Sequence, residues 1–327
     1  MARTQRVLEV DDTTAQALRG LWARAAETDG VGAVSEAFRL AVGPPRDGVV
    51  HLLRHADDDT LVGYAQVAEA GTADAVAELV VDPPSRRHGH GRALLDAALA
   101  EGARSVWAHG MLPAADALAR AAGLEMTRSL HLMKRPLTAA DAVDPQLPPG
   151  FSVRAFAPGR DDETWVRLNA AAFARHPEQG RLTVADLHER MAQPWFDPAG
   201  LILVVEDATG EVVAFHWTKV EPGEPVGRAH DASADAVREG VGRAHDSETD
   251  AVRVGTGEVY VVGVDPAHQG RGLGGPVTRL GLAHLARLGL QEVELYVDGD
   301  NTAARRTYER LGFTDVAVDG QYTLATT

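Results

Sequence analysis

Two short glycine-rich segments are the places where this chain is best equipped for chemistry. One is Gln269-Gly270-Arg271-Gly272-Leu273-Gly274, and the other is Arg86-Arg87-His88-Gly89-His90-Gly91. Each follows a Val-Asp-Pro at the end of an apolar run, and each precedes a helical pattern. Glycines let the backbone approach an anion closely, and the amides of such a loop and of the following helix N-terminus bind phosphate oxygens. The two segments therefore predict two phosphate-binding loops, with Arg271 able to add charge-assisted bonds.

Candidate proton-transfer residues lie in the second half. Tyr308 could protonate a departing thiolate, since the thiol pKa is about 8.5. Glu258 opens an apolar run and could accept a proton from an amine. Counted back from the glycine that follows each helix, Ala119 stands where Tyr308 stands, and Leu112 stands where Asn301 stands. Each candidate also has an ordinary interpretation, Tyr308 as an inner-face packing residue and Glu258 as a solvated residue at a strand start.

Composition excludes several classes of function. The 327-residue chain has a formal net charge of −15 and no basic stripe, which argues against nucleic acid and anionic lipid as partners. Cysteine is absent, so disulfides and thiolate metal sites are ruled out, and we expect no metal. We find neither an apolar signal-peptide core nor an apolar run near the ~20 residues of a membrane span. We therefore expect a cytoplasmic protein.

The elements that must position these residues occur twice in the same order. In the first half we expect helices at 13–27, 35–41, 89–103 and 114–122, and strands at 49–54, 61–67, 76–81, 105–109 and 126–133. In the second half we expect strands at 151–156, 201–206, 212–220, 258–264, 292–297 and 314–324, and helices at 161–174, 184–191, 272–288 and 302–311. This order predicts an internal duplication, with domains at 1–137 and 151–327 joined by a Pro-rich linker at 138–150.

A second, shorter repeat interrupts the later domain. Residues 226–231 recur at 241–246 within a polar insertion that spans 222–256. A tandem duplication in an exposed hairpin loop accounts for it, because added loop length costs little. His230 and His245 as a metal pair are the less favoured interpretation.

The glycine-rich loops resemble the signature [Gln/Arg]-x-x-Gly-x-[Gly/Ala] of the GCN5-related N-acetyltransferase superfamily. The resemblance covers nearly the whole chain and implies an α/β fold of two tandem domains, each with a mixed sheet that splays after its fourth strand to hold acetyl-CoA. Gly263 suits a bulge that exposes backbone donors to the thioester. The residues that the resemblance places against the cofactor are Val262, Gly263, Val264, Gln269, Gly270, Arg271, Gly272, Leu273, Gly274, Gly275, Asn301, Thr302, Ala303, Ala304, Arg305 and Arg306 in the second copy, and Leu79, Val80, Val81, Arg87, His88, Gly89, His90, Gly91 and Arg92 in the first.

The resemblance also assigns roles to the two copies. It makes the second copy catalytic, with Glu258 as base and Tyr308 as acid in a ternary complex. The first copy, which keeps the loop but lacks the acid, is expected to be structural or to bind acetyl-CoA without turnover. A monomer is expected, because pseudo-dimeric packing of the two halves can replace a homodimer interface.

Within the superfamily, segments 107–110, 175–180, 215–219 and 257–266 resemble actinobacterial tandem enzymes that acetylate the cysteinyl amine of a cysteine–glucosamine–inositol conjugate. This resemblance implies a small-molecule substrate site lined by Glu36, Glu178, Lys219, Glu258 and Tyr296. The ordinary alternatives are a solvated Glu36 and an edge-strand Lys219. Two other functions stay open: acetylation of another amine (a peptide N-terminus, a polyamine or an aminoglycoside), and a non-catalytic acetyl-CoA sensor.

Overall fold

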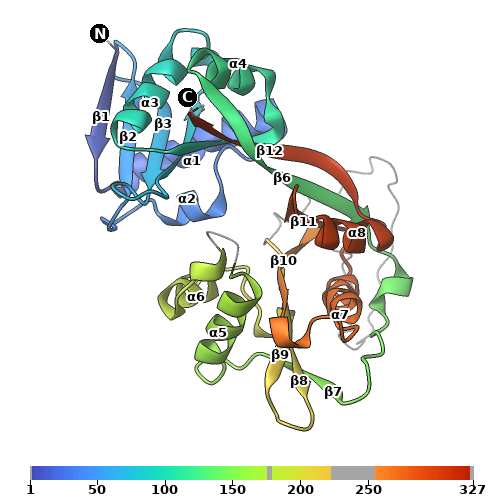
Figure 1. Ribbon diagram of the computed structural model, residues 1–327. Helices are drawn as coiled ribbons and strands as arrows, with labels where there is room; N and C mark the ends of the chain where they lie inside the picture. The colour runs from blue at the N-terminus through green and yellow to red at the C-terminus, as the bar shows by residue number, and fades with distance from the viewer. Residues whose placement is uncertain (1, 175–178, 222–254, 325–327) are drawn as a thin grey trace, which may run out of the picture. The chain divides into compact units, whose positions relative to one another are not determined.

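The computed structural model describes residues 2–174, 179–221 and 255–324, and the chain forms two compact units (Figure 1). Unit 1 comprises Met1–Leu132, Val297–Arg306 and Asp315–Thr327. Unit 2 comprises Met133–Tyr296 and Thr307–Thr314. The α/β class predicted from the sequence is confirmed. In the described ranges, no helix is both long enough and apolar enough to cross a membrane.

Unit 1 is built on a mixed sheet with strand order β1-β2-β3-β4-β5-β12-β6. The neighbouring strands are antiparallel except β4 and β5, which run parallel, among the pairs with a described register. Its elements are β1 (Arg3–Val7), α1 (Asp12–Asp29), α2 (Glu36–Leu40), β2 (Val50–His55), β3 (Leu61–Ala68), β4 (Val76–Val81), α3 (His90–Ala100), β5 (Ser105–Ala108), α4 (Pro113–Ala121) and β6 (Leu124–Pro136).

Unit 2 repeats this plan with strand order β6-β11-β10-β9-β8-β7. Strand β10 is parallel to β11 and antiparallel to β9. The elements from β7 to the end of the chain are β7 (Phe151–Ala155), α5 (Asp162–Ala172), α6 (Val184–Met191), β8 (Leu201–Glu206), β9 (Val212–Lys219), β10 (Thr256–Val264), α7 (Gly274–Arg287), β11 (Glu292–Asp298), α8 (Thr302–Arg310) and β12 (Thr314–Leu324). Of these, the end of β11, the first part of α8 and nearly all of β12 belong to unit 1.

The last strand of the chain completes the first unit. Strand β12 pairs antiparallel with β5, placing Gly320 opposite Ala108 and Tyr322 opposite Val106. The domain predicted at 151–327 includes β12. In the structure, Asp315–Thr327 belong to unit 1. The compact units therefore do not follow the order of the sequence.

In each unit the strands are covered by helices on both faces, because they carry apolar side chains on both sides. In unit 1, one face packs on Leu94 and Leu95 of α3, and the other packs on Leu18 and Trp22 of α1. In unit 2, α5 and α6 cover one face with a cluster that includes Trp165, Leu187 and Trp217, while Val277 and Leu280 of α7 cover the other.

Local signals explain where several helices begin and end. The Asp11 carboxylate accepts a hydrogen bond from the Thr14 amide (2.7 Å) and caps α1, and Gly30 ends this helix at φ = 71°. Thr183 and Asp186 form a capping box at the start of α6. These local interactions determine where α1 begins and ends and where α6 begins.

Candidate active site

The two glycine-rich loops have the same backbone conformation. Gly270 and Gly272 have φ angles of 78° and 79°, and at the matching positions Arg87 and Gly89 have 68° and 84°. Positive φ favours glycine, so Arg87 adopts a conformation that costs an ordinary residue roughly 1 kcal/mol or more. A Cβ added at Gly274 would meet no atom within 4 Å. The second loop therefore leaves open space beside its amides and beside the N-terminus of α7, which fits a phosphate group.

The first residue of each loop ties the loop to the strand before it. Arg86 Nε donates to the Val81 carbonyl (3.1 Å), and Gln269 Nε2 donates to the Val264 carbonyl (3.4 Å). This shared bond explains why either Arg or Gln serves at the first signature position, since both can donate to a carbonyl. The sequence pattern gave the residue type but not this anchoring role.

Arg271, expected to bind phosphate, has protein partners in this structure. Its Nη1 lies 2.9 Å from Glu206 Oε1, and its guanidinium lies 4.8 Å from the Phe151 ring centroid. The hydrogen bond from Arg271 lowers the pKa of the Glu206 carboxyl below its usual value. The side chain of Arg271 is about half exposed.

Strand β10 carries a bulge, and the bulge lies at Tyr260 rather than at Gly263. Val259 is opposite Thr218 and Val261 is opposite Trp217, which leaves Tyr260 as the extra residue. Gly263 has a regular partner, Phe215. A Cβ at Gly263 would lie 2.7 Å from the Phe215 ring, so glycine is required there by packing. The sequence-based placement of the bulge at Gly263 is wrong. Glycine is required there by the contact with the Phe215 ring, which the neighbouring sequence does not reveal, and not by an irregular backbone.

Lys219 and Glu258 meet beside an aromatic wall. They are direct register partners on β9 and β10, so their side chains share one face of the sheet. The Lys219 ammonium is 3.9 Å from Glu258 Oε2 and 2.8 Å from Glu221 Oε1. It also lies over the rings of Trp195 and Tyr260, at 5.1 and 5.5 Å from their centroids. The side chain of Lys219 is only 5% exposed, so these carboxylates and rings replace most of the water around its ammonium group.

This arrangement decides between the interpretations of Lys219. Strand β9 lies between β8 and β10, so Lys219 is not the guard of a sheet edge. Glu258 is also mostly covered, with 20% of its side chain exposed. Arg190 Nε donates to the Tyr260 hydroxyl (3.0 Å) and braces the aromatic wall from α6. Neither Arg190 nor Trp195 carried a sequence signal, because their relevance depends on where α6 and its following turn pack.

Tyr296 lies near Glu258 in the register of the sheet. Glu258 pairs with Glu294 on the parallel strand β11, and Tyr296 follows two residues later on the same side. Its side chain is 45% exposed. Lys134 binds Glu294 (2.9 Å), so carboxylates and an ammonium line this part of the sheet.

Tyr308 is buried on the inner face of α8. Its ring packs edge to face on Phe313, with centroids 5.9 Å apart. Burial raises the pKa of the Tyr308 phenol to about 12, so the phenol keeps its proton at neutral pH. Tyr308 is therefore a packing residue whose phenol is protonated at neutral pH.

The predicted cofactor residues at 301–306 belong to unit 1, whereas the glycine-rich loop at 269–274 belongs to unit 2. Asn301 Oδ1 accepts from the Ala304 amide (3.1 Å) and caps α8. Arg305 binds Asp315 (2.7 Å) and His131 (3.0 Å). The N-terminus of α8 is thus stabilised by the Asn301 cap and by the contacts of Arg305.

Comparison with known proteins identifies the architecture. The Acetyltransferase (GNAT) family matches the chain twice, over residues 16–123 and 165–313. The chain belongs to the GNAT acetyltransferase family. It is therefore an acetyl-CoA-dependent N-acetyltransferase, and the resemblance drawn from its loops is confirmed.

Relatives and solved structures support the tandem GNAT assignment over the full length. The chain is 45% identical over 318 residues to a mycothiol acetyltransferase of Streptomyces coelicolor, covering 96% of this chain and 93% of that protein. It is 47% identical over 312 residues to the Streptomyces avermitilis protein of the same name, covering 94% and 91%. The fold is similar to that of a tandem GNAT protein from the clavulanic acid biosynthesis pathway (TM-score 0.67, 18% identity, 100% of both chains). It is also similar to a GCN5-related N-acetyltransferase from Sphaerobacter thermophilus (TM-score 0.63, 21% identity, 98% and 94%).

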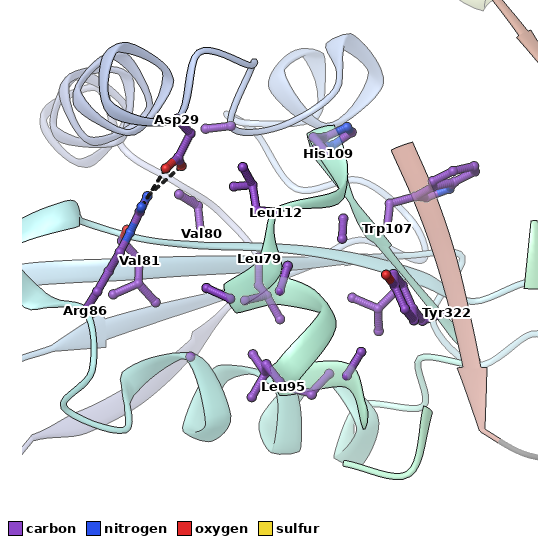
Figure 2. Close-up of a pocket in the computed structure, with 18 of the residues that line it drawn as sticks. Asp29, Leu79, Val80, Val81, Arg86, Leu95, Trp107, His109, Leu112 and Tyr322 are labelled. Carbon is purple, nitrogen blue, oxygen red and sulfur yellow. Dashed lines mark hydrogen bonds and ion pairs between the residues drawn. The ribbon is translucent and has the colours of Figure 1, made fainter. Parts of the chain in front are cut away.

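The first GNAT copy contains a pocket of about 440 Å³ behind its loop (Figure 2). Seven of its predicted cofactor residues line the pocket: Leu79, Val80, Val81, Arg87, Gly89, Gly91 and Arg92. Figure 2 shows the Asp29–Arg86 ion pair at one end and Trp107 and Tyr322 at the other. The ion pair is bidentate, at 2.6 and 2.7 Å. His88 and His90 are not among the lining residues. His90 instead accepts from Arg54 (3.2 Å), and His88 lies 3.4 Å from the Ser85 carbonyl.

A buried ionic cluster lies at the wall of this pocket. His109 Nδ1 is 2.8 Å from Asp319, and His109 Nε2 is 3.2 Å from Glu78. Burial alone would lower the pKa of His109, but the Glu78 and Asp319 carboxylates raise it to about 10. His109 is thus an imidazolium that joins β12 to the rest of unit 1. This cluster could not be predicted from local sequence, because Asp319 is 210 residues from His109.

Two further residues predicted to line the substrate site are Glu36 and Glu178. Glu36 begins α2 in unit 1 and is partly buried. Glu178 lies outside the described residues. The same holds for residues 222–254 of the predicted insertion, with His230 and His245.

Proposed function

We propose that the chain transfers acetyl from acetyl-CoA to the cysteinyl amine of 1D-myo-inositol 2-(L-cysteinylamino)-2-deoxy-alpha-D-glucopyranoside (desacetylmycothiol), giving mycothiol and CoA. Support comes from relatives named mycothiol acetyltransferase that align over more than nine tenths of their length. The observation that carries the mechanism is the Lys219–Glu258 pair, a mostly buried carboxylate beside an ammonium on adjacent strands.

In this proposal Glu258 accepts the proton of the attacking amine, directly or through one water molecule. The Lys219 ammonium favours the carboxylate form, in which Glu258 can act as a base. An α-amine has a pKa near 8, so freeing its lone pair at pH 7 costs about 1.4 kcal/mol. A lysine side chain would cost roughly 4–5 kcal/mol by the same arithmetic. One carboxylate base is therefore sufficient for a cysteinyl amine.

Tyr308 supplies the proton for the leaving group. The amine nitrogen bonds to the acetyl carbon, the carbon–sulfur bond breaks, and the CoA sulfur takes the phenolic proton. Because the pKa of Tyr308 is about 12, the phenol is protonated and uncharged before the reaction. Since the thiol pKa is about 8.5, the proton must be donated as the bond breaks and recovered from solvent afterwards.

We assign the substrate site to Glu36, Glu178, Lys219, Glu258 and Tyr296, and the reaction to the copy in residues 151–327. Carboxylates and an ammonium suit a polyhydroxylated sugar that carries a cationic amine. The first copy, with Ala119 at the position of the acid, is proposed to bind a CoA ester without turning it over. The enzyme is proposed to act as a cytoplasmic monomer.

The test is a substrate panel followed by mass spectrometry. Purified protein is incubated with acetyl-CoA and either desacetylmycothiol, a peptide, a polyamine or an aminoglycoside. Mass spectrometry is needed because desacetylmycothiol is itself a thiol and would react with a thiol dye. Acetylation confined to desacetylmycothiol is expected. Turnover of another amine alone would refute the substrate, and no turnover of any amine would favour a sensor.

A further inference from the structure

The pocket of unit 1 has an apolar inner end where the second copy has two aromatic rings. By position before and after the helix-ending glycine, Ala119 and Leu124 correspond to Tyr308 and Phe313. In the second copy those rings pack on each other. In the first copy both positions hold smaller residues, and both line the pocket. The pocket of the first copy therefore reaches the two positions that hold aromatic rings in the second copy.

This inner end is built from five elements of unit 1. Its residues all lie in one hydrophobic core cluster, and each is at least nine tenths buried. They come from α3, β5, α4, β6 and β12, and they are Leu95, Val106, Ala119, Leu124 and Tyr322. An apolar surface of this kind favours a hydrocarbon ligand over a polar one.

The other end of the pocket has the opposite character. It is formed by the loop amides around Gly89 and Gly91, by Arg87 and Arg92, and by the Asp29–Arg86 pair. Figure 2 shows this pair and Tyr322 at opposite ends of the pocket, with Leu79 and Leu95 between them. At the loop end, Arg86 is paired with Asp29 and Arg92 with Asp96, so Arg87 and the loop amides are the groups suited to an anionic head, while the hydrocarbon at the other end suits an apolar tail.

We propose that the first copy binds an acyl-CoA whose acyl chain is longer than acetyl, with the chain in the inner end of the pocket. The inference rests on the proposed binding of a CoA ester by this copy, and it adds the class of acyl group. Each methylene beyond acetyl that is placed against this apolar surface would be removed from water. Burying one methylene is worth about 0.8 kcal/mol, or about fourfold in affinity. With Ala119 at the acid position, the ester is bound as a ligand and not consumed.

Calorimetric titration of the full-length chain tests the proposal. The Gly272→Glu variant serves as the background, because it blocks the loop of the second copy and leaves one CoA site. The ligands are CoA, acetyl-CoA, butyryl-CoA and hexanoyl-CoA. We expect the affinity to rise about fourfold per methylene, on the order of 100-fold from acetyl to hexanoyl. Equal or weaker binding of hexanoyl-CoA would overturn the proposal.

Filling the inner end provides the decisive control. Ala119→Phe should abolish the preference for hexanoyl-CoA while CoA itself binds within about twofold of the unfilled background. Ala117→Phe adds the same ring to an exposed position of α4 and should keep the preference. Ala119→Val is the milder variant if the larger ring prevents folding.

The outcomes separate two hypotheses. A chain-length preference that survives both Ala119 variants would place the acyl chain elsewhere and refute this inference. Failure of CoA and of every ester to bind would refute CoA binding by the first copy altogether. Mycothiol formation by the otherwise unmodified enzyme is measured separately and tests the proposed function on its own.

Discussion

The fourth strands of the two copies, β4 and β10, both end in Val-Asp-Pro and lead into the same loop conformation, but they differ further back. We count the cross-strand residue pairs back from Val81 in β4 and from Val264 in β10. The sixth pair is Val76–Ala68 in unit 1 and Glu258–Lys219 in unit 2. The register of β4 with β3 is regular over Val76–Val81, whereas β10 carries the bulge at Tyr260.

The downstream helices differ in the same sense. Where α8 has the buried phenol of Tyr308, α4 has only the buried methyl group of Ala119 at the corresponding position. The first copy thus keeps the phosphate loop and has neither the candidate acid nor the candidate base. In the proposed mechanism, ligand binding and catalysis therefore rest on separate residues, and we expect that each can be removed alone.

The largest effect should come from the two loop glycines. Gly272→Glu places a carboxylate at positive φ beside the phosphate site, so we expect acetyl-CoA turnover to fall below detection. Gly89→Glu makes the same change in the first copy and should keep the rate within about threefold, because that copy is proposed not to turn over its ligand. Steady-state rates with varied acetyl-CoA measure both. Complete loss in Gly89→Glu would show that the first copy is directly required.

A roughly hundredfold loss is expected on removing the base. Glu258→Gln should lower kcat/KM by about 10², the range of general base catalysis. Part of the rate should return near pH 9, because the amine then loses its proton to solvent. The matched control is Glu294→Gln, the register partner on β11, which should change the rate less than about threefold. Equal losses in the two variants would assign the effect to local charge instead of proton transfer.

Removal of the acid should have a smaller effect. Tyr308→Phe keeps the ring packed on Phe313 and should lower kcat well over tenfold while acetyl-CoA affinity stays nearly constant. Rapid-quench rates and equilibrium binding separate the two quantities. Glu309→Gln, at the next and exposed position of α8, is the control and should be neutral. An unchanged kcat in Tyr308→Phe would remove Tyr308 from the acid role.

The smallest effect concerns stability and pH. Because the folded-state pKa of His109 is raised from 6.5 to about 10, its cluster stabilises unit 1 fully below pH 6.5. That contribution is lost as the pH rises from 6.5 through 10. Scanning calorimetry should show a lower melting temperature at pH 9.5 than at pH 7. His109→Gln should melt lower at pH 7 and lose less on going to pH 9.5; an unchanged pH dependence would contradict the role of this histidine.

Much of the fold was predictable because its elements have strong local patterns. The expected bounds of β4, β8 and β12 agree with the structure, as do those of α6. Strand β1 was missed, since Arg3–Val7 contains a single apolar residue and is held by backbone pairing with β2. A polar edge strand gives no apolar alternation to detect.

The site was predictable only where its chemistry is local in sequence. The glycine-rich loops and their positive φ angles could be read from a few residues. The bulge at Tyr260, the wall of Trp195 and Arg190, and the ionic partners of His109 depend on pairings between distant segments. Gly263 illustrates the limit: its residue type is imposed by the Phe215 ring, which the neighbouring sequence does not reveal.

The placement of β12 has a consequence for how the protein is made. Strand β5 leaves the ribosome about two hundred residues before the strand that pairs with it, because Ala108 is opposite Gly320. During synthesis the edge of β5 therefore waits without its native neighbour, and an uncovered strand edge invites pairing with other chains. The first unit to be translated is thus completed only after the segment around Gly320 has been made.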